Sequence, residues 1–312
     1  MKTKFDFTKP STLVFTALLC TFLWGSAFPS IKIGYSLFHI ESADTASQIL
    51  FAGSRFFLAG ILTVLLGSLI KKRFLKPNKD SIKNVFKLSL VQTLLQYLFF
   101  YIGLAHTSGV KASIINGTNV FIAILFSALI FKEKLTAKKI IGCVLGFLGI
   151  IIINLNGQGL SFSFSVLGEG AIFMSAIMYA LSSCMIKGYT KTEDAFTLSG
   201  YQFFIGGFIM MIIGSSMGGK LSGFTPASTS LLVYMAMISA VSYSLWGVLL
   251  KYNPVSKVTI FGFSNPMFGV ILSAILLNER NQAFTLRGLV SLVLVCLGIY
   301  IVNAPEKKKV NA

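Results

Sequence analysis

The chain is poor in charge, and above all in acidic residues. Of its 312 residues 12% are charged, with 10 Asp or Glu against 27 Lys or Arg. An average soluble protein has about one quarter charged residues, so this chain lacks the charge that a water-exposed surface needs. Because 54% of the residues are hydrophobic, the composition excludes a water-soluble protein and indicates one that lies in lipid.

Residues that carry catalysis or bind metals are also scarce. The two histidines, His39 and His106, belong to no metal-binding motif. The four cysteines fall inside apolar stretches, at spacings that suit neither a disulfide framework nor a metal. The basic residues occur in short runs between long apolar segments, which argues against nucleic acid as a partner. The sequence therefore predicts no metal, no cofactor and no enzyme activity.

Long apolar runs are what the sequence does have. A helix needs about 20 mostly apolar residues to cross a bilayer, and only helices or closed barrels satisfy their backbone groups there. The runs are continuous rather than alternating with a period of two, so we predict an all-α polytopic membrane protein with ten transmembrane helices. The predicted spans are residues 12–32, 47–70, 86–106, 111–131, 136–154, 166–187, 196–217, 229–250, 257–277 and 285–303.

The basic residues indicate the orientation. With the N-terminus inside, 21 of the 27 fall on one side of the membrane, five on the other, and Arg55 lies within the second span. The densest patch is at residues 71–87. Since cytoplasmic loops carry an excess of Lys and Arg, the net charge of +17 predicts a multi-pass cell-membrane protein with both termini in the cytoplasm.

The two halves of the chain resemble each other. A shift of 147 residues superimposes residues 55–60 on 202–207, and shifts of 146 to 155 align the other spans in the same order. Because each half has five spans, an odd number, the halves enter the membrane with opposite orientations. We predict two inverted five-helix repeats, at residues 1–156 and 157–304, and a basic cytoplasmic tail at 305–312. Counterpart pairs include Tyr97 and Tyr243, Asn119 and Asn265, and Glu133 and Glu279.

These features lead to a family resemblance. The segment at 24–28 (Trp-Gly-Ser-Ala-Phe), the intramembrane Arg55 and the apolar run that ends at Glu133 resemble the EamA-type drug/metabolite transporter superfamily. The resemblance covers nearly the whole chain and implies a ten-helix carrier with a central cavity, and it suggests export of amino acids or related metabolites. That family commonly has proline in both halves, whereas here Val120 stands opposite Pro266. We expect Pro266 to kink the ninth span.

Uncharged polar and aromatic side chains recur on one face of several spans. Such side chains are costly against lipid, so we expect them to face the bundle interior and to line the solute site, although any one of them could serve only helix packing. The predicted substrate-binding residues are Trp24, Gln96, Tyr97, Asn116, Asn119, Tyr179, Ser242, Tyr243, Trp246 and Asn265.

The few charged groups near the spans are assigned other roles. For Arg55 we favour a structural or gating role over anion binding, because its counterpart Gln202 is neutral. Carboxylates at span ends are expected to pair with neighbouring helix starts, and Glu169 lies at a helix N-terminus, where a carboxylate is favoured. The predicted gating or structural residues are Arg55, Glu133, Glu169, Pro266 and Glu279.

Together these features predict a transporter that moves a small neutral or zwitterionic organic solute by alternating access between inverted halves. Its partners are the small-molecule substrate and the lipid bilayer, and the oligomeric state stays open. The scarcity of deep carboxylates favours a facilitator or a weakly coupled exchanger over tight proton coupling. The alternatives are a channel, which would show continuous polar rings along a pore, and a membrane-embedded transferase, which would need clustered acids or histidines.

Overall fold

The computed structural model describes residues 6–41, 43–106, 115–154, 165–276 and 286–303, and every regular element in these ranges is helical. Short 3-10 or π turns, η1 (Lys79–Ser81), η2 (Ser89–Leu95), η3 (Val166–Gly170) and η4 (Ile260–Phe263), join some of the helices. The α-helices are α1 (Pro10–Leu37), α2 (Thr45–Lys71), α3 (Ile82–Leu88), α4 (Gln96–His106), α6 (Asn119–Phe131), α7 (Ala137–Asn154), α8 (Ala171–Tyr189), α9 (Ala195–Ser216), α10 (Pro226–Tyr252), α11 (Val255–Thr259), α12 (Ser264–Leu276) and α14 (Leu286–Asn303).

Six helical segments are long and apolar enough to cross a membrane. They are Pro10–Leu37, Thr45–Lys71, Lys79–Gly103, Val166–Tyr189, Ala195–Ser216 and Pro226–Tyr252. Each overlaps a span predicted from the sequence, and α1 continues five residues past the predicted end at 32. Apart from these six segments there are shorter apolar helices, such as Ile115–Phe131. The protein is thus a helical, multi-pass membrane protein.

Side chains at the helix starts explain several boundaries. Asp44 accepts a hydrogen bond from the backbone N–H of Ser47 before α2, and Asp194 accepts one from Phe196 N–H before α9. Before α10, Thr225 and Ser228 cap each other's backbone N–H groups. These residues satisfy N–H groups that would otherwise lack a partner at a helix start.

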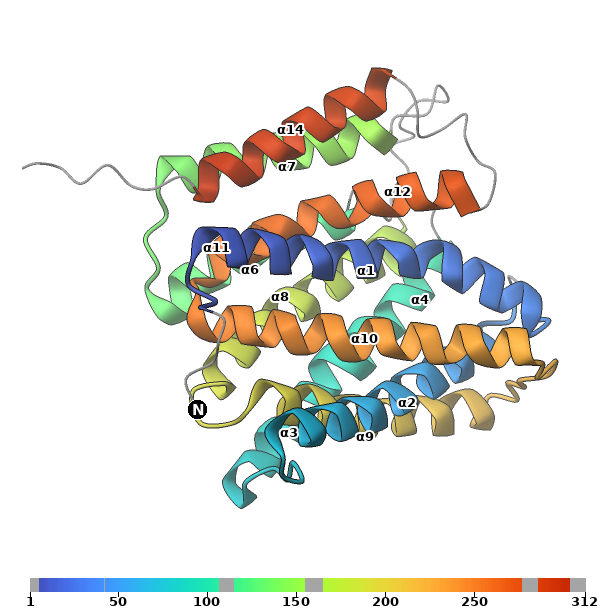
Figure 1. The fold of residues 1–312 in the computed structure, drawn as a ribbon. Helices are drawn as coiled ribbons and strands as arrows, with labels where there is room; N and C mark the ends of the chain where they lie inside the picture. Colours follow the sequence, from blue (N-terminus) through green and yellow to red (C-terminus); the bar gives the residue numbers. More distant parts are fainter. Residues whose placement is uncertain (1–5, 42, 107–114, 155–164, 277–285, 304–312) are drawn as a thin grey trace, which may run out of the picture.

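The helices pack side by side in a bundle (Figure 1), in which α7 and α14 form one edge and α2 and α9 another. Glycines let α2 and α9 cross closely. A Cβ added to Gly53 would lie 3.0 Å from the carbonyl oxygen of Gly207, and one added to Gly60 would lie 2.8 Å from that of Gly200. In lipid there is no hydrophobic driving force between helices, so such crossings depend on the close van der Waals packing that small residues allow.

Glycines also let α7 and α14 approach closely at their edge of the bundle. A Cβ on Gly142 would lie 2.7 Å from the carbonyl oxygen of Gly298, and one on Gly149 would lie 2.9 Å from that of Ser291. Ser291 also donates a hydrogen bond of 2.6 Å to the carbonyl oxygen of Gly149. Both helices therefore approach each other at backbone distance.

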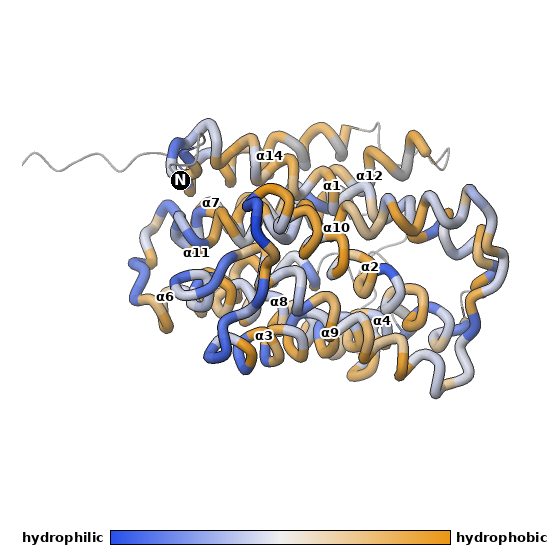
Figure 2. The backbone as a smooth tube through the Cα atoms, turned by 60° about the horizontal axis from the view of Figure 1, so that its bottom comes forward, coloured by the Kyte–Doolittle hydropathy of each residue, from blue (hydrophilic) through white to orange (hydrophobic). Residues whose placement is uncertain are grey.

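Hydrophobic residues predominate along the helices, and hydrophilic residues gather toward the helix ends and connections (Figure 2). Leu129 and Leu286 are both 77% exposed, and Phe15 is 71% exposed. Large apolar side chains on an outer surface of this kind match a lipid environment. At one end of the bundle Lys71 forms an ion pair with Asp194, which ties the α2 end to the α9 start.

Candidate functional site

Four aromatic side chains meet at the centre of the bundle. The ring centroid of Trp24 in α1 lies 5.0 Å from that of Tyr243 and 4.9 Å from that of Trp246, both in α10. The hydroxyls of Tyr97 in α4 and Tyr243 lie 2.9 Å apart and share a hydrogen bond. The two tyrosines are 146 residues apart, so counterparts from the two halves touch. We call Trp24, Tyr97, Tyr243 and Trp246 the aromatic cluster.

Two phenylalanines from α2 and α9 extend this cluster. The Phe56 ring lies 4.5 Å from Tyr97 and 5.3 Å from Phe203, and Phe203 lies 4.8 Å from Tyr243. Sequence reasoning missed Phe56 and Phe203 as site residues, although both lie at the same position of the aligned segments 55–60 and 202–207. That alignment is the signal that could have found them. Tyr179 lies in α8, where its carbonyl oxygen accepts hydrogen bonds from Ser182 and Ser183.

Several polar atoms of the aromatic cluster and of other predicted site residues are buried without a hydrogen-bond partner. An unpaired buried polar group costs free energy, and native proteins keep few of them. Such atoms therefore mark places that a ligand or water could occupy. Among the predicted substrate-binding residues they are Trp24 Nε1, Gln96 Oε1, Ser242 Oγ, Trp246 Nε1 and Asn265 Oδ1.

A second group of buried polar side chains is paired. Gln202 donates a 2.7 Å hydrogen bond to Gln92 Oε1 and accepts one of 3.1 Å from Thr93. Gln92 in turn donates a 3.0 Å bond to Ser182 Oγ. This amide network of Gln92, Thr93, Ser182 and Gln202 joins η2, α8 and α9. Gln92 and Ser182 were not predicted, because pairing across three helices depends on helix rotation.

The third span contributes Gln92 and Thr93 to this network from a stretch that is not an ordinary α-helix. Residues 89–95 form the π-helical turn η2 between α3 and α4, where an ordinary helix was predicted. A π turn adds a residue to the helical turn and is frequent at functional sites. It carries Gln92 and Thr93, which are 1% and 0% exposed, into the network.

The fourth and ninth spans both contain an irregular turn just before the predicted asparagines Asn119 and Asn265. A turn at Thr118 precedes α6, which begins at Asn119, and the 3-10 turn η4 precedes α12, which contains Asn265. A Cβ on Gly262 in η4 would lie 3.4 Å from Val120, so the two turns adjoin. Asn116 and Asn119 are half-buried.

Pro266 is the third residue of α12 and follows the irregular turn Ile260–Phe263. Because proline has no N–H, it cannot bond to the carbonyl oxygen of Gly262, which lies within that turn. The first turn of a helix lacks N–H partners anyway, so proline costs little there. The counterpart helix α6 begins afresh without proline.

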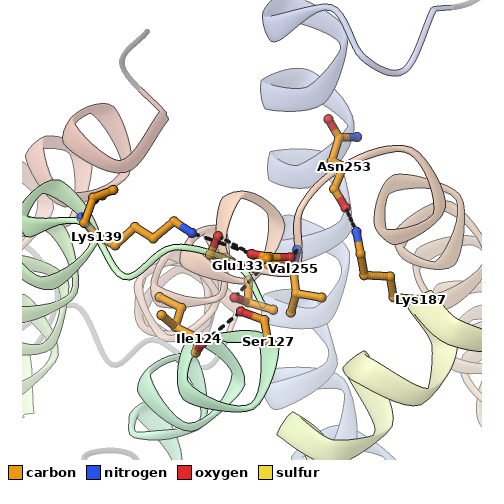
Figure 3. Close-up of polar contacts among 10 residues, drawn as sticks. Ile124, Ser127, Glu133, Lys139, Lys187, Asn253 and Val255 are labelled. Carbon is orange, nitrogen blue, oxygen red and sulfur yellow. Dashed lines mark hydrogen bonds and ion pairs between the residues drawn. The ribbon is translucent and has the colours of Figure 1, made fainter. Parts of the chain in front are cut away.

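Glu133 joins the end of α6 to the start of α11, as Figure 3 shows. Its carboxylate accepts hydrogen bonds of 2.9 Å from Val255 N–H and 2.8 Å from Ser256 Oγ, and Lys139 Nζ lies 3.6 Å away. Burial works to raise the pKa of Glu133, but the two hydrogen bonds and Lys139 outweigh it and hold the pKa below its ordinary value. Nearby, Lys187 donates a 2.6 Å bond to the carbonyl oxygen of Asn253.

The other predicted gating carboxylates differ. Glu169 is 7% exposed and accepts a 2.7 Å hydrogen bond from the N–H of Ser165 at the start of η3. Glu279 lies outside the described residues. Within the described ranges no group of three His, Cys, Asp or Glu side chains could hold a metal ion.

Arg55 lies in α2 with 5% of its surface exposed, and its guanidinium carbon is 4.3 Å from the centre of the Phe56 ring. Its Nε has no hydrogen-bond partner. Phe56 in turn lies 4.5 Å from Tyr97, so one ring of α2 separates Arg55 from the aromatic cluster.

A pocket of about 410 Å³ lies at the basic end of the bundle. It includes none of the predicted substrate-binding residues. Its charged lining comes from the α2–α3 connection, the α8–α9 connection and the end of α10: Lys71, Arg73, Lys76, Lys191, Glu193, Asp194 and Lys251. Glu193 accepts a hydrogen bond from Asn78 N–H there, which holds the two connections together.

The structure is thus a multi-pass helical bundle in which several buried polar atoms among aromatic rings have no partner. Comparison with known proteins identifies the family. The sequence pattern of the EamA-like transporter family matches residues 11–155 and again residues 166–304. The chain therefore belongs to that family, within the drug/metabolite transporter superfamily.

Similar proteins come from bacteria and archaea. The uncharacterized transporter YvbV of Bacillus subtilis is 28% identical over 94% of this chain and 92% of its own length. An uncharacterized transporter from the sor 3' region of Acidianus ambivalens is 30% identical over 68% of this chain and 80% of its own length. A crystal structure with 13% identity matches at a TM-score of 0.77 over 95% of this chain and 97% of that chain, which shows the fold alone. The transporter names are consistent with a protein that is not an enzyme.

Proposed function

We propose that the protein moves a small neutral or zwitterionic organic solute, an amino acid or related metabolite, out of the cell by alternating access. The observation that carries this proposal is the set of unpaired buried polar atoms around the aromatic cluster. Trp24 Nε1 and Trp246 Nε1 are donors, and Asn265 Oδ1 is an acceptor. A solute with both donors and acceptors would satisfy them, while the rings contact its apolar part.

In this proposal ten helices cross the membrane as two inverted repeats, 1–156 and 157–304, followed by the tail 305–312. The six long segments are joined by the four apolar elements α6, α7, α12 and α14. Two separate family matches support the division. The contacts between counterparts, Tyr97 with Tyr243 and Phe56 with Phe203, support a pseudo-twofold relation.

The interrupted helices support a binding site near the bundle centre. In many transporters broken helices meet near the bilayer midplane and present polar backbone groups to the solute. Here the breaks before α6 and α12 adjoin, and Asn119 and Asn265 lie just after them. We assign hydrogen bonding to Gln96, Tyr97, Asn116, Asn119, Ser242, Tyr243 and Asn265, and packing of the apolar part to Trp24, Tyr179 and Trp246.

Glu133 is assigned to the gate at the basic end. Its bonds to Val255 and Ser256 hold the end of α6 against α11, and opening that end would have to break them. Glu279 is assigned to the opposite gate as its repeat counterpart, Glu169 to a structural role at the start of its span, and Pro266 to the helix break. The predominance of Lys and Arg at the Glu133 end favours placing that end, and both termini, in the cytoplasm of a cell with this protein in its plasma membrane.

The test is uptake by proteoliposomes offered twenty radiolabelled amino acids, with Asn265→Ala and Gln96→Ala beside the wild type. We expect at least one amino acid to enter, and both variants to slow its entry. Asn78→Ala is the matched control, because Asn78 is an exposed residue at the basic end. If no amino acid enters, or if both site variants match the wild type, the proposal fails.

A pH gradient across the same vesicles tests coupling. A facilitator equalises the solute concentrations and does not accumulate it. Accumulation driven by the proton gradient would instead require a titrating group, and Glu169→Gln would then show whether this carboxylate is the relay.

A further inference from the structure

Arg55 in α2 is buried without an ion-pair partner among the described residues. The residue is 5% exposed and its Nε has no partner. Among the ion pairs found between described residues, none involves Arg55. Taking an unpaired charge out of water is expensive, and buried charges are normally paired. The cation–π contact with Phe56 at 4.3 Å supplies only part of the lost hydration.

The groups around Arg55 are suited to a ligand with negative oxygens. Its Nε is a buried donor without a partner, and the Phe56 ring that its guanidinium contacts lies 4.5 Å from Tyr97. Arginine has only donors. A buried, charged donor without a partner matches a carboxylate, which offers acceptor sites only.

The repeat provides an internal comparison. Gln202, the counterpart of Arg55, is 0% exposed, and its side chain is bonded to Gln92 and Thr93. A neutral, paired amide at this position is therefore compatible with the helix packing of the other half. The scaffold does not need a charge here, so the positive charge of Arg55 requires another explanation.

The position relative to the aromatic cluster supplies that explanation. Phe56 contacts Arg55 and also Tyr97, whose hydroxyl bonds to Tyr243. A solute that contacts the cluster on the Phe56 side would therefore have one end toward the guanidinium. One guanidinium matches one carboxylate by two parallel hydrogen bonds.

We propose that Arg55 binds the carboxylate of the transported solute, so that the site selects carboxylate-bearing solutes over amines and amides of the same skeleton. This inference rests on the proposed function and deepens it. The hydroxyl of Tyr243 contributes to the same subsite, and the rings of Trp24 and Trp246 contact the apolar part.

The experiment measures competition in proteoliposomes. The tracer is the best-transported of the twenty amino acids, and the competitors are the same unlabelled amino acid and its carboxamide, which keeps the amine and the side chain. In the wild type we expect half-inhibition by the amino acid at a concentration about tenfold or more below that of the amide. Equal inhibition would overturn the inference whatever the variants do.

The variants separate binding from structure. Arg55→Gln, which copies Gln202, is expected to raise the half-inhibiting concentration of the amino acid at least about tenfold and that of the amide less than about threefold. Arg55→Lys keeps the charge and should restore part of the preference. The thermal midpoint of Arg55→Gln in detergent should fall little, because no ion pair between described residues involves Arg55 and the variant loses only the contact with Phe56.

Each failure has its own signature. If the wild type transports no amino acid, the proposed function fails, and the carboxylate subsite fails with it. If the wild type transports amino acids but Arg55→Gln weakens the amino acid and the amide equally, Arg55 is structural and the inference alone fails. A preference for the carboxylate that survives in Arg55→Gln would also overturn it.

Discussion

In the amide network the buried polar atoms are paired, and in the aromatic cluster several are not. In the amide network Gln92, Thr93, Ser182 and Gln202 use one another as partners. Around Trp24 and Trp246 the indole N–H groups and Ser242 Oγ have no partner, although they are equally removed from the surface. Both regions contain polar side chains on transmembrane helices, so polarity alone does not identify the site.

The difference separates what holds the bundle together from what a solute can use. Paired groups gain no further hydrogen bond when a ligand enters, whereas unpaired groups do. The network and the glycine crossing of α2 with α9 form a scaffold, and the aromatic cluster forms the part whose polar atoms can still bond to a solute. Substitutions in the scaffold should therefore change stability, and substitutions in the cluster should change transport.

The largest stability effect is expected at the α2–α9 crossing. Gly207→Val places a branched side chain against the backbone of α2, since even a Cβ would overlap Phe57 N and lie 2.8 Å from the carbonyl oxygen of Gly53. We expect a loss of about 3 kcal/mol, because the backbone cannot yield as a side chain can. The measurement is the thermal midpoint of unfolding in detergent, with size-exclusion chromatography used to follow the folded protein that remains after heating.

Gly188→Ala is the control for that variant. Nothing lies within 4 Å of a Cβ at Gly188 in α8, so the alanine should be neutral or slightly stabilising. A Gly207→Val protein as stable as Gly188→Ala would show that α2 and α9 do not cross at backbone distance.

The amide network should give the next largest effect. Gln92→Leu leaves the Gln202 amide without its 2.7 Å acceptor, and we expect a loss of about 1 to 3 kcal/mol. Adding Gln202→Leu should cost less than the sum of the single variants, because the second change removes the stranded group. Additive losses in this double-mutant cycle would mean that the two amides do not interact.

A smaller effect, which depends on pH, is expected at Glu133. Its pKa is lower in the folded protein than its ordinary value of 4.5. A depressed carboxylate pKa contributes stability that is present above the unfolded-state pKa and is lost as the pH falls through the folded-state pKa. Glu133→Gln should remove about 1 kcal/mol at neutral pH and flatten this acid dependence.

Thermal midpoints between pH 3 and pH 7 provide the measurement, with Asp80→Asn, an exposed carboxylate, as the control. If Glu133→Gln and wild type keep the same difference across that range, the ion pair and the two hydrogen bonds do not hold α6 to α11.

The sequence was sufficient for the helical class, most span positions and the pairing of counterparts such as Tyr97 and Tyr243. These follow from apolar runs and internal alignment, which are properties of the chain itself. It did not predict the π turn at 89–95 or the bond of Gln92 to Ser182, because these depend on how neighbouring helices rotate against each other. Nor could it separate Ser182 from Ser242, two small hydroxyl residues in apolar surroundings.

These two serines give the smallest stability effect and the most direct test of the comparison. Both are 0% exposed. Ser182 accepts a bond from Gln92 and donates one of 2.8 Å to the carbonyl oxygen of Tyr179, whereas Ser242 Oγ has no partner. Ser182→Ala should lose about 1 kcal/mol and keep its solute preference.

Ser242→Ala should change stability by less than about 0.5 kcal/mol, because it removes no hydrogen bond. It should nevertheless slow transport, since the hydroxyl that it deletes is one that the solute would satisfy. Thermal midpoints and proteoliposome uptake of both alanine variants measure the two effects together. If Ser242→Ala transports like the wild type while Ser182→Ala does not, the solute contacts the amide network. Unpaired polar atoms would then not mark the site.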